Sequence, residues 1–150
     1  TNLLKRGSIA VVGAAESDLG QVAPHTSPVD LMAQATMRAL DDCGLTLKDV
    51  DALYVAATQV RMGPMSLAEY LRIKPKVFDG TQIGGSSFMT HVAHAQMAIQ
   101  LGLCEVAVIA YGSTQRSVSR AAASPREFNP YESPYRPILP ISAYAMAAAR

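Results

Sequence analysis

The sequence predicts an α/β fold with a parallel sheet. Short runs rich in β-branched and apolar residues alternate with longer amphipathic segments, and capping signals precede several of those segments. Nearly half of the 150 residues (49%) are hydrophobic and only 17% are charged. A chain of this length and composition can bury a core, so we expect a globular protein.

The first two predicted elements are a strand and a helix. Residues 8–13 (SIAVVG) are apolar almost throughout, as expected of a strand covered on both faces. Ser27 has the position of an N-cap, with Pro28 at the first helical position and Asp30 at capping-box spacing. Gly44 ends this helix. Its predicted buried stripe has helical spacing and consists of Leu31, Ala35, Ala39 and Cys43.

The alternation continues along the chain. The pattern predicts a turn at 46–49, a strand at 52–57, a helix at 66–73, a strand at 76–80, a helix at about 86–101 and a strand at 105–112. Residues 1–112 are thus expected to form the core. Residues 113–150 are expected to form a loop excursion, rich in proline and arginine, and the start of an Ala-rich helix at 141–150. That helix has no closing Gly or Asn, so we expect the chain to be a piece of a longer protein.

Charge and cysteine content exclude several classes of function. Thirteen Lys and Arg oppose twelve Asp and Glu, for a net charge of +1, without a basic block. We therefore expect no binding to nucleic acid or to an anionic membrane. The uncharged run at 80–104 is interrupted by glycines and histidines, so it predicts a buried strand and helix and no membrane span. The two cysteines lack metal spacing, which predicts no metal site and a reducing cytoplasm.

Residues 79–96 (DGTQIGGSSFMTHVAHAQ) have the layout of a strand-to-helix elbow. Glycines allow a sharp backbone turn, and the amides at a helix start suit a thioester oxygen or a phosphate. The predicted substrate-binding residues are Gly84, Gly85, Ser86 and Ser87.

The elbow also suggests a nucleophile and a base. Ser86 and Ser87 are its candidate hydroxyls, and a serine attacks usefully only beside a base. His91 and His94 follow Ser87 by four and seven residues, so they share one side of a helix. Ser86 and His91 are therefore candidate catalytic residues. In the alternative interpretation the serines cap the helix and the histidines are hydrogen-bonded within a packing layer.

The order of elements resembles the N-terminal half of the thiolase superfamily. The resemblance lies in IAVVGAAESDLG, DLMAQATMRALDDCGL, VDALYVAA, the elbow and AIQLGLCEVAVIAYGS, and it covers nearly the whole chain. It looks closest to the sterol-carrier or lipid-transfer thiolases. The resemblance implies a layered αβαβα fold of two similar halves with a central buried helix, a homodimer or tetramer, and acyl-coenzyme A as substrate.

The resemblance also locates the nucleophile of working thiolases, a cysteine at the start of the helix after the third strand. Counting back without gaps from AIQLG places that position on Gly85, which has no side chain to acylate. A register shifted by one residue would place Ser86 there. Arg116, Arg120, Arg126 and Arg136 are candidate partners for the coenzyme A phosphates, with solvated side chains as the alternative.

Cysteine-free relatives in this branch include aldolases that cleave side chains of steroid coenzyme A thioesters together with a small OB-fold partner. The resemblance therefore predicts carbon-carbon bond cleavage or formation beta to a thioester, with retro-aldol cleavage favoured and no metal. The alternatives are a conventional acyltransferase or thiolase and a non-catalytic lipid or acyl-coenzyme A binding protein.

Overall fold

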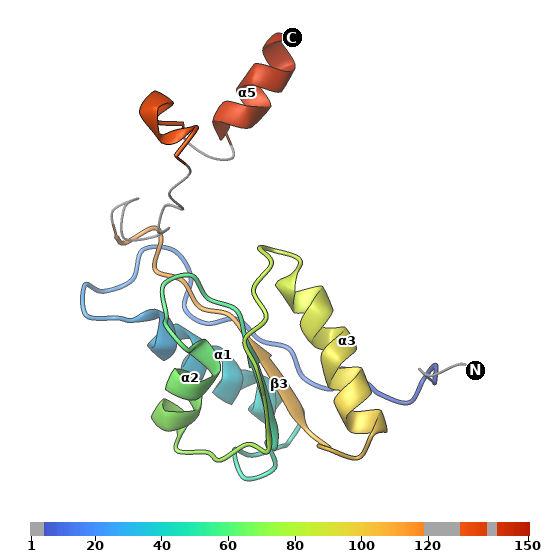
Figure 1. Ribbon diagram of the computed structural model, residues 1–150. Coiled ribbons are helices and arrows are strands. Elements are labelled where there is room, and N and C mark those ends of the chain that lie inside the picture. The colour runs from blue at the N-terminus through green and yellow to red at the C-terminus, as the bar shows by residue number, and fades with distance from the viewer. Residues whose placement is uncertain (1–4, 119–129, 138–140) are drawn as a thin grey trace.

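The computed structural model describes residues 5–118, 130–137 and 141–150. Within them, three parallel strands form one sheet in the order β2-β1-β3 (Figure 1). The strands are β1 (Ala52–Val55), β2 (Val77–Asp79) and β3 (Ala107–Ala110). The helices are α1 (Pro28–Asp42), α2 (Gly63–Leu71), α3 (Ser87–Gln100), the short 3₁₀ helix η1 (Ser133–Tyr135) and α5 (Ile141–Ala149). The predicted α/β class and parallel pairing are confirmed.

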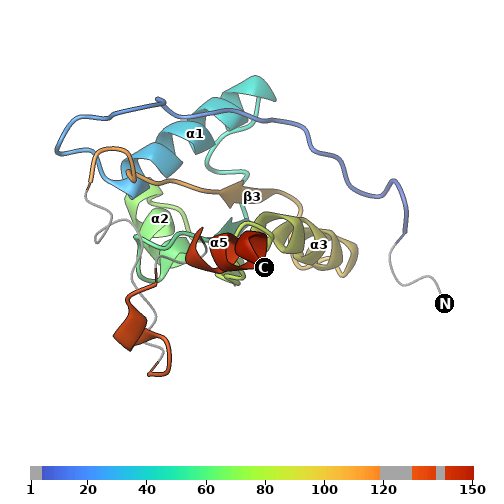
Figure 2. The ribbon, with the colours of Figure 1, turned by 90° about the horizontal axis from the view of Figure 1, so that it is seen from above.

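The central strand β1 separates two apolar layers. Leu53 and Val55 pack with side chains of α1 and α2 on one face of the sheet. Ala52 and Tyr54 pack with side chains of α3 on the other face. Figure 2 shows α1 and α3 on opposite sides of β3. All four side chains of β1 are at most 1% exposed, because the strand is covered on both faces and paired on both edges.

The capping box that the sequence predicts begins α1. Ser27 Oγ accepts a hydrogen bond from the Asp30 backbone N–H at 3.2 Å, and the Asp30 carboxylate accepts one from the Ser27 N–H at 2.8 Å. The Tyr70 hydroxyl of α2 donates to the same carboxylate at 2.6 Å. This bond, followed by those from Ser27, lowers the pKa of Asp30. The cap therefore also joins α1 to α2.

The predicted buried stripe of α1 is largely wrong. Leu31 is buried, but Ala35, Ala39 and Cys43 are only half-buried. The buried face consists of Leu31, Met32, Ala33, Thr36 and Leu40. The predicted stripe is instead partly covered by the N-terminal segment, because Gly13 lies so close that a Cβ on it would be 2.2 Å from the Ala39 carbonyl oxygen.

The predicted strand at residues 8–13 is also wrong for the described structure. The segment is an extended trace in Figure 1 that pairs with no strand among the described residues. Val11 and Val12 are 82% and 61% exposed. The chain beyond it is held to α1, where the Ala14 N–H donates to Asp42 at 3.2 Å. An apolar run becomes a strand only where a neighbouring backbone supplies hydrogen-bond partners.

The start of α2 differs from its prediction. The helix begins at Gly63, not at Ser66, and has Pro64 in its first turn. Ser66 does not cap it, because its hydroxyl donates to the Arg61 carbonyl at 3.0 Å.

The predicted helix at 141–150 is confirmed as α5, where Tyr144 and Met146 are 70% and 69% exposed. Residues 119–129 and 138–140 of the predicted loop excursion lie outside the described residues.

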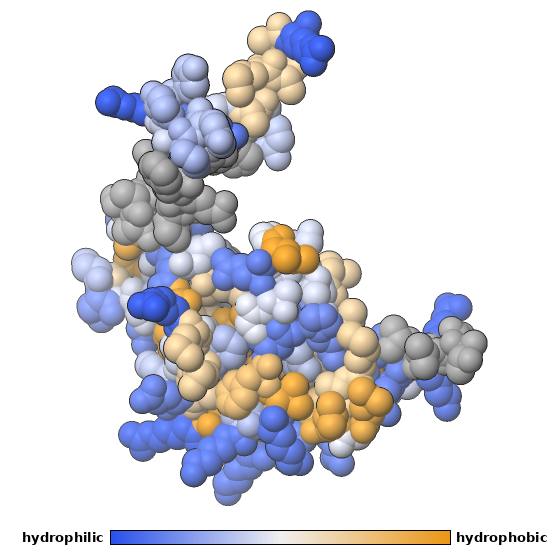
Figure 3. Space-filling view, in the orientation of Figure 1, coloured by the Kyte–Doolittle hydropathy of each residue, from blue (hydrophilic) through white to orange (hydrophobic). Residues whose placement is uncertain are grey.

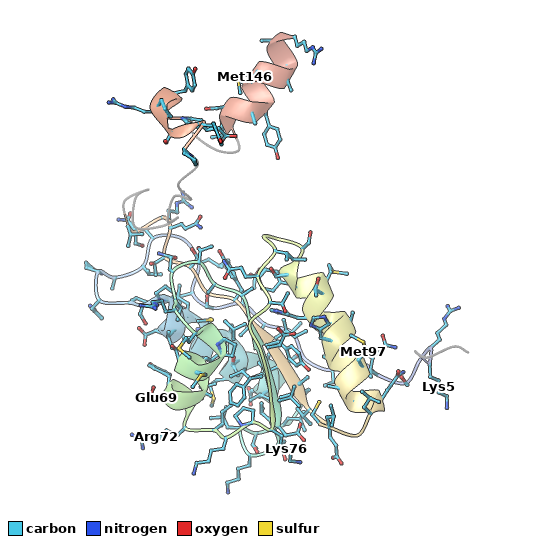
Figure 4. All side chains as sticks on the ribbon, in the orientation of Figure 1. Lys5, Glu69, Arg72, Lys76, Met97 and Met146 are labelled. Atoms are coloured by element: carbon cyan, nitrogen blue, oxygen red, sulfur yellow. The ribbon has the colours of Figure 1, made fainter. Side chains whose placement is uncertain are left out.

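Asp51 joins the strands at the amino edge of the sheet. Its carboxylate accepts hydrogen bonds from the backbone N–H groups of Glu105 and Val106 at 2.9–3.1 Å. Lys76, labelled in Figure 4, places its ammonium group 3.5 Å from the same carboxylate. These contacts connect the chain before β1 to the starts of β2 and β3. None of the helices in the described part of the chain is long and apolar enough to cross a membrane.

Candidate functional site

The carboxyl ends of the three strands meet at one edge of the sheet because the strands are parallel. In open α/β sheets this edge is where ligands bind. The loops at 56–62, 80–86 and 111–118 follow β1, β2 and β3, and Figure 1 shows them rising from the same end of the sheet. The predicted elbow is the second of these loops.

Ser87 closes the elbow. Its side chain is fully buried, and its hydroxyl accepts from the Ile83 N–H at 2.9 Å and donates to the Gly84 carbonyl at 2.6 Å. The Ser87 N–H donates to the same carbonyl at 3.1 Å. Because both the proton and an acceptor site of this hydroxyl are engaged, Ser87 stabilises the turn.

The two glycines of the elbow differ. Gly84 has a φ of +75°, a conformation that favours glycine. Gly85 does not have a positive φ, and a Cβ built on it would have no atom within 4 Å. The backbone at Gly85 therefore faces open space at the start of α3, in the position where the resemblance places a nucleophile.

The structure does not join Ser86 to His91. Ser86 is exposed, and its side chain makes no capping hydrogen bond to α3. His91 is fully buried, and its Nε2 lies 3.0 Å from the Thr81 carbonyl oxygen. Because a carbonyl only accepts, Nε2 carries the proton. Nδ1 of His91 has no hydrogen-bond partner among the described residues. The catalytic roles of Ser86 and His91 stay predictions.

A second histidine on α3 pairs with the last residue of β2. His94 Nδ1 contacts Asp79 Oδ2, and the other carboxylate oxygen accepts from the Thr81 N–H at 2.7 Å. Burial opposes ionisation of Asp79, but the hydrogen bonds from His94 and Thr81 outweigh it and lower the pKa of this carboxyl. The carboxylate therefore holds both a side chain of α3 and the backbone that enters the elbow.

Sequence reasoning missed a polar cluster that joins the first and third loops. The Gln59 side-chain oxygen accepts from the Ser113 hydroxyl at 2.8 Å and from the Thr114 N–H at 2.9 Å. Its amide nitrogen donates to the Thr114 hydroxyl at 3.2 Å. The position of these polar residues just after two parallel strands was the signal that could have identified them.

An aromatic contact joins the third loop to α3. The rings of Tyr111 and Phe88 pack edge to face with centroids 5.4 Å apart, and Tyr111 is 49% exposed. Phe88 also packs edge to face on His91. The elbow thus has an aromatic side wall that sequence reasoning missed, since it depends on how β3 and α3 sit together.

Two other groups with potential chemistry, Tyr54 and Cys104, are buried. Burial, followed by the charges of Cys104 and Asp79, raises the pKa of Tyr54 to about 12. Burial, followed by the charge of Asp51, raises the pKa of the Cys104 thiol. Both groups therefore stay protonated at neutral pH, which fits the prediction that Cys104 is a buried apolar residue. Within the described ranges, no group of three potential ligands could hold a metal ion.

A shallow cavity of about 240 Å³ lies at the other end of α3. Asp79 and His94 contribute to its wall, which is otherwise formed by Tyr54, Val77, Phe78, Met97, Ala98, Leu101 and Leu103. Figure 3 shows the hydrophobic surface over this end of α3. Of the four candidate arginines, Arg116 and Arg136 are exposed, and Arg120 and Arg126 lie outside the described residues.

The chain is similar to known proteins in sequence and in structure. No protein-family model matches the chain. A curated relative, the 17-hydroxy-3-oxo-4-pregnene-20-carboxyl-CoA lyase of Mycobacterium tuberculosis, is 27% identical over 156 aligned positions, which cover 96% of this chain and 40% of the lyase. The chain therefore spans about two fifths of the length of this relative.

Solved structures give the same fold. An Ltp2-ChsH2(DUF35) aldolase has a TM-score of 0.59 at 24% identity, over 89% of this chain and 34% of the other. A monomeric SCP2-thiolase like protein from Mycobacterium smegmatis has a TM-score of 0.53 at 23% identity, over 65% and 22%. OleA of Xanthomonas campestris with lauric acid and lauroyl-CoA has a TM-score of 0.60 at 17% identity, over 77% and 36%. The chain has the α/β fold of thiolase-like proteins, and its similarity to a solved SCP2-thiolase like protein agrees with the predicted resemblance to the sterol-carrier branch.

Proposed function

We propose that the protein is a lyase that acts on acyl-coenzyme A thioesters and cleaves the carbon-carbon bond beta to the thioester by a retro-aldol reaction. The observation that carries the proposal is the empty space at Gly85, where the resemblance places a nucleophile. The hydroxyl of Ser87 is engaged on both sides, so it is no substitute. The similarity to a curated coenzyme A thioester lyase supports the same reaction class.

The proposed reaction needs no acyl-enzyme. A base removes the proton of the β-hydroxyl group, the bond between the α and β carbons breaks, and the β carbon becomes a carbonyl. The electron pair of the broken bond forms a thioester enolate, which an acid protonates at the α carbon. The start of α3 suits the enolate oxygen, because the amides at a helix start and the helix dipole favour negative charge there.

The proposed reaction also needs groups beyond the elbow. Coenzyme A enters as part of the substrate, and no metal takes part. We assign the base and the acid to parts of the protein outside the elbow. A small OB-fold protein is the proposed partner, supported by the solved aldolase that combines Ltp2 with ChsH2(DUF35). A homodimer is the proposed assembly.

The test uses the full-length protein and a β-hydroxyacyl-coenzyme A with a branched or sterol side chain, with and without the OB-fold partner. We expect the thioester to be converted to a shorter acyl-coenzyme A and a free carbonyl compound, measured by liquid chromatography and mass spectrometry. No cleavage under either condition, together with thiolysis of a 3-ketoacyl thioester, would show that the proposed reaction is wrong.

Two variants at the elbow sharpen this test. Gly85→Cys places a thiol in open space, so it should fold and trap a covalent acyl adduct that the unmodified protein lacks. Gly85→Ala is the matched control, with a methyl group that cannot be acylated.

A second candidate function is acyl transfer through Ser86, because this exposed hydroxyl makes no capping hydrogen bond. It predicts an acyl adduct in the unmodified protein that disappears in Ser86→Ala. Under the retro-aldol proposal, Ser86→Ala retains cleavage and no adduct forms in either protein.

A further inference from the structure

The peptide that leads into the elbow is held on both sides by two histidines of α3. The Thr81 carbonyl accepts from His91 Nε2 at 3.0 Å. The Thr81 N–H donates to Asp79 at 2.7 Å, and Asp79 is in turn held by His94. His91 and His94 are three residues apart on one helix, so both point to the same side of α3.

The other anchored part of the elbow is the turn closed by Ser87. Its hydroxyl binds the backbone of Ile83 and Gly84. Gly85 and Ser86 lie between this turn and the first residue of α3, and both are exposed. The loop is thus fixed at Thr81 and at the turn, while the two residues that face open space depend on those anchors for their position.

His94 is too far from Gly85 and Ser86 to act on a substrate beside them. His94 lies eight positions after Ser86, which at 1.5 Å per residue corresponds to about 12 Å along the helix. A proton acceptor must lie within about 3 Å of the proton's heavy atom, or one water away. Any influence of His94 on the elbow must therefore pass through Asp79 and Thr81.

We propose that His94 and Asp79 are positioning residues that set the place of the Gly85 and Ser86 amides through Thr81. His94 is 36% exposed at its side chain and Asp79 is 17% exposed, so the pair is partly shielded from water and each partner restricts the other. The low pKa of the Asp79 carboxyl keeps it ionised at neutral pH, so that it accepts both bonds. The inference rests on the proposed function for its catalytic readout only.

The experiment compares two substitutions at His94 in the full-length protein. Asn has a side-chain N–H close to the place of the histidine Nδ1–H, so His94→Asn keeps the bond to Asp79, whereas His94→Leu removes it. His94→Leu should lower kcat roughly 10- to 100-fold with little change in KM, because a small displacement of a binding amide weakens transition-state contacts. His94→Asn should restore most of the loss. Met97→Leu, one turn further along α3 in Figure 4, is the control and should behave as the unmodified protein.

A second measurement does not depend on activity. Hydrogen exchange of the Thr81 amide should be faster in His94→Leu than in His94→Asn, while the amides of β1 exchange at unchanged rates. If His94→Leu leaves both the Thr81 exchange and kcat unchanged, the positioning role is wrong even though the proposed function stands. If His94→Asn is as inactive as His94→Leu while Thr81 stays protected, His94 acts by another route and the inference is likewise wrong. If the unmodified protein does not cleave its substrate, the proposed function fails and the exchange rates alone decide the inference.

Discussion

Two apolar stretches of similar composition have different fates in this protein. Residues 52–55 form the central strand β1, in which Leu53 is fully buried. Residues 8–13 are extended but unpaired within the described structure, and Val11 is 82% exposed. The stretches differ in their surroundings. Strand β1 has a parallel strand on each edge and helices on both faces, whereas residues 8–13 contact α1 at their end, through Gly13. Apolar composition therefore predicts a strand only together with its partners.

The largest expected effect tests this difference directly. Leu53→Ala should lower the free energy of unfolding by roughly 2–5 kcal/mol, because it leaves a cavity between β1 and the helices on that face. Val11→Ala should change it by less than about 0.5 kcal/mol, because the side chain is mostly in water. Urea denaturation of both variants measures the contrast. Equal losses in the two variants would mean that residues 8–13 are packed as a strand.

A smaller effect on stability should appear where residues 8–13 contact α1. Gly13→Ala should lower the free energy of unfolding by roughly 1–3 kcal/mol, because the added methyl would meet the Ala39 carbonyl at 2.2 Å and the backbone must move. Gly85→Ala is the matched control, with no atom within 4 Å of its methyl, and should stay within about 0.5 kcal/mol. Thermal and urea denaturation of both variants give the comparison. A neutral Gly13→Ala would mean that the N-terminal segment is not held against α1.

The smallest effect concerns the ion pair between Asp18 and Arg38, which joins the chain after residues 8–13 to α1. Arg38, through its hydrogen bond and charge, lowers the pKa of Asp18. The folded-state pKa therefore lies below the unfolded value of about 3.9. The contribution of the pair to stability is present above that unfolded pKa and is lost as the pH falls through the folded-state pKa.

Arg38→Gln should move the pKa of Asp18 back towards its ordinary value, as followed by an NMR titration of the carboxyl group. Stability itself should change little, since both side chains are exposed and salt screens their attraction. An unchanged Asp18 titration would mean that the two side chains do not pair in solution.

Much of the elbow could be predicted from sequence, because local rules define it. The glycines and serines after a short strand predicted a turn into a helix, and α3 starts at Ser87 as expected within a residue. The partners of each polar atom could not be predicted. That His94 pairs with Asp79, and that Gln59 joins Thr114 across 55 positions of the chain, depends on which strand ends lie next to each other.

By itself the sequence determined the alternation of strands and helices, the capping box of α1, the elbow at Gly84 to Ser87 and the likeness to thiolases. The alternation, the capping box and the elbow arise from propensity, spacing and short-range hydrogen bonds, which act within a few residues, whereas the likeness to thiolases is a resemblance between sequences. Only the tertiary structure decided that residues 8–13 pair with no strand of the described part of the chain, that Met32 and Leu40 replace Ala35 and Ala39 in the core, and that Thr81 is held from both sides. The physical reason is that burial and pairing are properties of neighbours, and the neighbours come from distant parts of the chain.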